Sequence, residues 1–112
     1  MAALTSIVPS AVGTLAAAAA VSSTDTISQA QLGSNGAFLL VINAGASPDT
    51  VAISDSGNTP AGNPGSSSGG TVANATNKVF YINPYAVNPT TGVVTVTHSF
   101  TTTVTYYLFP KG

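Results

Sequence analysis

Cysteine, tryptophan, arginine and glutamate are all absent from this chain of 112 residues. The lack of cysteine excludes a disulfide framework and a metal site built from thiolates. A chain of this length forms one domain, which is large enough to bury a hydrophobic core but too small for two independent ones. The best candidate for a membrane span, residues 15–21, is far shorter than the roughly 18 apolar residues that a membrane helix needs. We therefore expect a single domain without a membrane span.

Charged side chains are scarce: Asp25, Asp49 and Asp55 stand against Lys78 and Lys111, for a formal net charge of −1. Two lysines neutralise too few phosphates to hold nucleic acid, and they provide little attraction to an anionic membrane. With 44% hydrophobic residues, the composition is that of a folded chain rather than a disordered one. Surfaces with so little charge tend to associate. We therefore expect an assembly component with neither a nucleic-acid nor a membrane partner.

The clearest strand pattern lies in the last fifth of the chain. Apolar residues alternate with threonine and serine over residues 94–100, and a similar alternation runs over 104–108. A period of two is typical of a strand with one buried face. A three-residue loop at 101–103 brings the two apolar faces into register, with His98 opposite Tyr106. We therefore predict a hairpin. Its hydroxyl-rich face would carry Thr95, Thr97, Ser99, Thr105 and Tyr107.

Four further segments have the composition of short strands: residues 14–23, 38–42, 51–53 and 78–83. The continuous apolar run FLLVI at 38–42 predicts a strand that is buried on both faces. These segments are separated by turn signals, and no amphipathic helix stands out among them. The pattern predicts an all-β fold: a single-domain antiparallel β-sandwich of jelly-roll or immunoglobulin-like topology.

Two parts of the chain lie outside this strand pattern. Residues 1–13 predict an extended N-terminal arm, so that the sandwich domain itself spans 14–112. Within the domain, residues 55–70 are rich in glycine and serine and lack side chains that could anchor a core. Such a composition is typical of a flexible surface loop.

The residues needed for a catalytic or metal site are almost missing. His98 is the single histidine, and the alternation places it among apolar neighbours, whereas Ser99 points to the opposite face and cannot act as its nucleophile. Asp49 and Asp55 flank the strand at 51–53 and lack the spacing of a calcium loop. We therefore predict that His98 is a packed core or interface residue. The chain is expected to be no enzyme and to hold no metal or cofactor.

Four segments, in their order and spacing, carry a resemblance to a known family. They are Ser23-Thr24-Asp25-Thr26 after an alanine-rich strand, residues 35–43 with the glycine turn that follows, Asn83-Pro84-Tyr85, and residues 92–99. Together they resemble the small head decoration, or cement, proteins of tailed bacteriophages. The chain departs from that pattern at Ala37, where the family is expected to carry a charged residue.

The resemblance implies a β-sandwich that binds the outer surface of the major capsid protein shell and stabilises the head. It implies a homo-oligomer, with a trimer favoured over a dimer, located on the virion surface and in the host cytoplasm before assembly. The candidate contacts with the capsid or with other subunits are Leu4, Ile7, Val8, Tyr85, Thr95, Thr97 and Tyr107. The alternative is a carbohydrate-binding β-sandwich, such as the receptor-binding knob of a phage fibre, in which Tyr85 and Tyr107 would stack on sugars.

Overall fold

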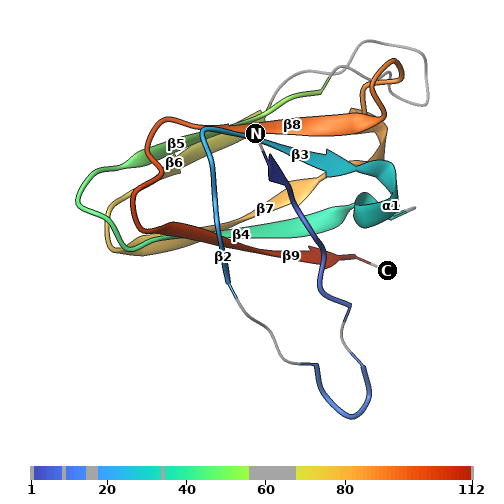
Figure 1. Ribbon diagram of the computed structural model, residues 1–112, viewed down its shortest axis with the longest axis horizontal. Coiled ribbons are helices and arrows are strands. Elements are labelled where there is room, and N and C mark those ends of the chain that lie inside the picture. Colours follow the sequence, from blue (N-terminus) through green and yellow to red (C-terminus); the bar gives the residue numbers. More distant parts are fainter. Residues whose placement is uncertain (1, 9, 15–17, 34, 56–67, 112) are drawn as a thin grey trace.

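The computed structural model describes residues 2–8, 10–14, 18–33, 35–55 and 68–111, which form two packed β-sheets (Figure 1). Sheet A has the strand order β1 (Ala2–Ala3), β3 (Thr24–Ser28), β8 (Val93–His98), β5 (Asp49–Ile53) and β6 (Ser68–Val72). Sheet B has the order β2 (Ala19–Ala20), β9 (Val104–Pro110), β4 (Ala37–Asn43) and β7 (Thr76–Ile82). A single helical turn, α1 (Gln29–Leu32), follows β3, and a 3₁₀ turn, η1 (Pro84–Ala86), follows β7. The predicted all-β sandwich is confirmed.

The strand pairing has the nested pattern of a jelly roll. β5 pairs with β6, β4 with β7, β3 with β8 and β2 with β9, all antiparallel, so that each pair encloses the previous one along the chain. A double ribbon of this kind, wrapped into two sheets of four strands, is jelly-roll topology. The short β1 extends sheet A by pairing parallel with β3. Of the two predicted topologies, the chain therefore forms the jelly roll.

The predicted hairpin of β8 and β9 is wrong, because the two strands lie in different sheets. β8 pairs with β3 and β5, whereas β9 pairs with β2 and β4. The intervening residues 99–103 form an arch between the sheets, in which Thr103 takes the left-handed φ of 56° that usually favours glycine. The alternation within each strand was predicted correctly, since both apolar faces point into the core. The apolar faces of β8 and β9 contact each other across the core, and they are not neighbours within one sheet.

This sheet assignment also divides the predicted hydroxyl-rich face. Its residues separate into Thr95 and Thr97 on the outer side of sheet A, and Thr105 and Tyr107 on the outer side of sheet B. These side chains are half-buried, whereas the alternate residues of both strands are buried in the core. The two groups of hydroxyls are therefore on opposite surfaces of the molecule.

β4 is buried on one face only, which corrects the prediction for residues 38–42. Leu39 and Val41 are fully buried, whereas Phe38 on the other face is 38% exposed. β4 is a central strand between β9 and β7. In a two-layer sandwich each sheet has one covered face, so the outer side of an apolar strand stays uncovered.

Turn residues set where β4 begins and where β7 ends. Gly36 lies at φ 84°, and a Cβ at this position would collide with the carbonyl oxygen of Ile82, so only glycine fits here. At the other end, the backbone N–H of Tyr85 donates to Asn83 Oδ1 at 2.8 Å, which caps the 3₁₀ turn that Pro84 opens. These two turns lie beside each other and close one end of the sheet.

The first described residues of the predicted N-terminal arm are docked on the sandwich. Leu4 is only 3% exposed and belongs to the core, and its N–H donates to Thr26 O at 2.8 Å in sheet A. Ile7 N–H donates to Leu108 O at 2.7 Å in sheet B, so the segment crosses from one sheet to the other. The described residues 10–14 lie away from the body of the molecule (Figure 1).

Two other predicted segments fall partly outside the described residues. Of the strand predicted at 14–23, the described part forms only β2, and residues 15–17 are not described. Of the loop predicted at 55–70, residues 56–67 are not described. Its last three residues belong to β6, which pairs with β5.

Candidate functional site

Two of the three aspartates and the single histidine converge in the core of the sandwich. Asp25, Asp49 and His98 come from β3, β5 and β8, which are neighbouring strands of sheet A. Asp25 is opposite Val96 and His98 is opposite Val51, so each carboxylate lies diagonally across from the imidazole on the inner face. The side chain of His98 is 1% exposed, and those of both aspartates are fully buried. The register of three strands thus assembles the cluster.

The imidazole of His98 lies between the two carboxylates. Its Nδ1 is 2.6 Å from Asp49 Oδ2, and because a carboxylate oxygen only accepts, the Nδ1–H is the donor. Its Nε2 is 3.9 Å from Asp25 Oδ2 and has no hydrogen-bond partner. A protonated imidazole in this position would lie within ion-pair distance of both carboxylates.

Each carboxylate also holds a neighbouring turn. Asp25 Oδ2 accepts from the backbone N–H of Ser22 at 3.1 Å, and Asp25 Oδ1 accepts from the Ser22 hydroxyl. Asp49 Oδ1 accepts from the backbone N–H of Phe100 at 3.2 Å. The cluster therefore ties the turn before β3 to the arch after β8, and through Asp49 to the start of β5.

This arrangement is that of a structural cluster. The Ser22 hydroxyl is hydrogen-bonded to Asp25 and to a backbone carbonyl, not to His98, so no nucleophile and base are paired. The described residues contain no group of three histidine, cysteine, aspartate or glutamate side chains placed to hold a metal ion. The prediction that His98 is a packed core residue is confirmed.

Sequence reasoning missed the two carboxylates beside His98, although a signal was present. Asp25 lies within β3, between Thr24 and Thr26. The alternation there places Asp25 on the same face as the buried Ile27. In the same way, Asp49 shares the inner face of β5 with the apolar residues of that strand.

The predicted contact residues near the N-terminus differ in their exposure. Leu4 is buried in this chain's own core and is unavailable to a partner in this conformation, because its side chain fills the edge of the sandwich. Ile7 is half-buried beside β9, and Val8 is exposed. Of these three, Val8 is the residue that presents an uncovered apolar side chain.

The remaining predicted contacts lie on three separate surfaces. Tyr85 is exposed on the 3₁₀ turn after β7. Thr95 and Thr97 face outward from sheet A. Tyr107 faces outward from sheet B, where its ring stacks on Phe109 at 5.9 Å between centroids and an interplanar angle of 10°. The structure therefore does not bring these residues together into one site.

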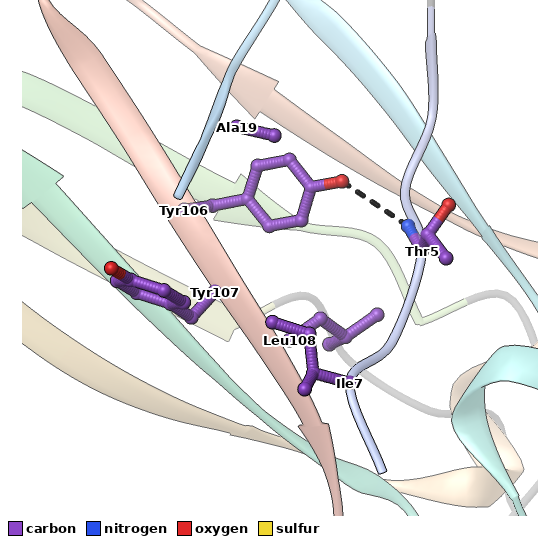
Figure 2. Close-up of a pocket in the computed structure, with 6 residues that line it drawn as sticks. All are labelled: Thr5, Ile7, Ala19, Tyr106, Tyr107 and Leu108. Carbon is purple, nitrogen blue, oxygen red and sulfur yellow. Dashed lines mark hydrogen bonds between the residues drawn. The ribbon is translucent and has the colours of Figure 1, made fainter. Parts of the chain in front are cut away.

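A shallow pocket lies between the N-terminal segment, β2 and β9 (Figure 2). Its lining residues are Thr5, Ile7, Ala19, Tyr106, Tyr107 and Leu108. The hydroxyl of Tyr106 accepts a hydrogen bond from the backbone N–H of Thr5 at 3.1 Å, which Figure 2 shows as a dashed line. With a volume of about 210 Å³, the pocket is below the usual range for small-molecule sites.

The outer faces of the two sheets differ in chemistry, and no residue within the strands places a charged side chain on either of them. The outer face of sheet A presents hydroxyl and small side chains from Thr24, Thr26, Thr50, Ala52, Thr71, Thr95 and Thr97. The outer face of sheet B presents mainly apolar and aromatic side chains from Phe38, Leu40, Ile42, Val79, Tyr81, Tyr107 and Phe109. Phe38 packs on Tyr81 with ring centroids 5.9 Å apart, and Lys111 Nζ lies 5.2 Å above the Tyr81 ring.

No protein-family model, curated protein or solved structure matches this chain. None of the helices in the described part of the chain is both long and apolar enough to cross a membrane. The candidate functional sites are the outer faces of the two sheets, because the buried cluster is closed and the pocket is small. The apolar face of sheet B is the stronger of the two, since aromatic side chains are enriched in protein interfaces.

Proposed function

We propose that this chain is a virion structural protein of a tailed bacteriophage, which binds the outer surface of the major capsid protein shell and stabilises the head. The observation that carries the proposal is the placement of the charges. Asp25 and Asp49 are buried in the core, and Lys78 shares the inner side of sheet B with Val41. Lys111 lies at the end of sheet B, with its Nζ 5.2 Å from the ring of Tyr81. Another protein can therefore cover most of either outer face without desolvating a charge, with the Lys111 ammonium group at one end of the sheet B face.

We assign capsid binding to the outer face of sheet B. Its aromatic and aliphatic side chains have the composition of an interface core, whereas the threonine-rich face of sheet A does not. Tyr107, which the sequence singles out as a contact, is part of this face. Jelly rolls occur in viral capsid proteins and in lectins, so the topology is compatible with the proposal without deciding it.

The stabilisation needs no chemistry. A protein that binds only the expanded shell adds its binding free energy to the stability of that state. Many symmetry-related copies act on one head, so a modest free energy per copy becomes large for the whole particle.

A matched pair of charge substitutions tests the proposal. Heads stripped of this protein should rupture at a lower temperature, and adding back the purified chain should restore the rupture temperature. Phe38→Lys, on the outer face of sheet B, should weaken binding to stripped heads by about tenfold or more, because a charge is then buried in the interface. Ala52→Lys places the same side chain on the exposed outer face of sheet A and should bind like the unmodified chain.

Two outcomes would count against these assignments. If stripped and reloaded heads rupture at the same temperature, the chain has no cementing role. If Ala52→Lys loses binding while Phe38→Lys retains it, the capsid-binding face is that of sheet A. Circular dichroism of both variants should show the same β-sheet content, because both side chains point away from the core.

Carbohydrate binding is the second candidate, and the exposed rings of Tyr81 and Tyr85 favour it. An exposed aromatic ring offers an apolar face against which a sugar ring can pack. A glycan array with the purified chain would then show saturable binding, and Tyr85→Ala would lower the affinity by about tenfold. An array without saturable binding would exclude this candidate.

A further inference from the structure

β7 is an edge strand with a long open side. It is the last strand of sheet B, and among the described residues no strand pairs with it on the side opposite β4. It spans seven residues, whereas the other edge of the same sheet, β2, has only two. An exposed edge of this length presents unpaired backbone groups that act as a template for another strand.

The hydrogen-bond pattern determines which residues of β7 present those groups. Lys111 N–H donates to Gly36 O, and Ala44 N–H donates to Thr103 O, so the even-numbered residues along β4 face β9. Backbone groups of successive residues point to opposite sides of a strand. The odd-numbered residues of β4 therefore face β7, where they pair with its even-numbered residues. The N–H and C=O groups directed to the open edge are those of Asn77, Val79 and Tyr81.

These three residues are exposed, and the strand carries one charge. Val79 is 61% exposed, and its side chain belongs to the outer face of sheet B, as does that of Tyr81. Lys78 is the charged residue, and lysine is a common means of discouraging edge pairing. The repulsion is strongest where a partner strand places a second positive charge directly opposite it.

We propose that β7 pairs antiparallel with β7 of a second copy of this chain, about a two-fold axis through Val79. In this register Val79 is opposite its counterpart, and Asn77 is opposite Tyr81. The three residues whose backbone groups point to the open edge are symmetric about Val79. Each of their unpaired N–H and C=O groups therefore acquires a partner. Lys78 is opposite Phe80, so no like charges face each other. The edge is therefore complementary to itself, as a two-fold interface requires.

The two-fold register also joins the outer faces of sheet B from both copies into one apolar surface, with the two Val79 side chains at its centre. A three-fold ring would need a second edge to receive β7, and the other described edges are the two-residue β1 and β2 and the glycine-containing β6. An interface along one strand of roughly 24 Å is small, so we expect a micromolar dimer. The inference concerns self-association and does not rest on capsid binding.

Sedimentation of the full chain over a micromolar concentration range tests the proposal. The unmodified chain should form a dimer. Val79→Lys should weaken the dimer by about a hundredfold, because it places two ammonium groups together at the axis. The matched control is Val12→Lys, at a valine that is 97% exposed far from β7, and it should dimerise like the unmodified chain. Circular dichroism establishes that each variant is folded.

Two further measurements test the register itself. An equimolar mixture of Val79→Lys and Val79→Asp should recover the dimer, since the axis then sets opposite charges face to face. Directly paired residues lie about 5.5 Å apart between Cα atoms, which is within disulfide range. Because the chain has no cysteine, Val79→Cys should form a disulfide-linked dimer on mild oxidation. Val12→Cys should form far less of it. A chain that stays monomeric or forms a trimer would overturn the proposal. So would a Val79→Lys dimer of unchanged affinity, or a mixture that stays monomeric.

Discussion

Replacing His98 with alanine is expected to lower the free energy of unfolding by about 3–5 kcal/mol. The substitution removes the imidazole ring, which donates a hydrogen bond to Asp49 Oδ2 and lies beside Asp25 Oδ2. Both carboxylates stay buried. The remaining donors to these carboxylates come from Ser22 and Phe100. A buried carboxylate that loses its partner keeps its desolvation cost, so the folded state is destabilised. Urea denaturation followed by circular dichroism measures the change.

Thr97→Ala is the matched control for this prediction. Thr97 precedes His98 on β8 but faces outward, so its substitution should change stability by no more than about 1 kcal/mol. The double variant His98→Leu with Asp49→Leu should cost clearly less than the two single changes together, because it removes both members of a coupled pair. A loss below about 1 kcal/mol for His98→Ala would show that the cluster does not stabilise the fold.

Leu4→Ala is expected to cost about 2–5 kcal/mol, the usual range for truncating a buried leucine. Leu4 lies in the core, and the segment around it hydrogen-bonds to both sheets. If residues 1–13 were a free arm, the same substitution would be nearly neutral. Thermal or urea unfolding of the purified chain measures the difference.

Val12→Ala provides the comparison within the same N-terminal region. Val12 is almost fully exposed, so its truncation should alter the free energy of unfolding by less than about 0.5 kcal/mol. Equal effects of Leu4→Ala and Val12→Ala would contradict the docking of the N-terminal segment. If Leu4→Ala has the larger effect, Leu4 is occupied in the core, and assembly contacts from this region are expected from Val8 and not from Leu4.

The sequence predicts some features of the buried cluster of Asp25, Asp49 and His98 and not others. That Asp49 and His98 each point inward follows from the alternation in their own strands. That they meet at 2.6 Å follows only from the register between β5 and β8, two segments that lie about half the chain apart. A single sequence contains the alternation within each strand, but it does not contain the register between two distant strands.

By itself, the sequence determined the strands at 38–42, 51–53, 78–83, 94–98 and 104–108 and the all-β class, and it also determined which side chains share a face within 94–98 and 104–108. These predictions follow from composition and from the two-residue period, and both signals act within a single strand. Only the tertiary structure decided that β8 and β9 lie in opposite sheets, that Leu4 completes the core and that the outer face of sheet B stays open. The physical reason is that an apolar strand face is equally well buried by a neighbour in its own sheet or by the sheet across the core. Only the pairing of the whole chain chooses between them.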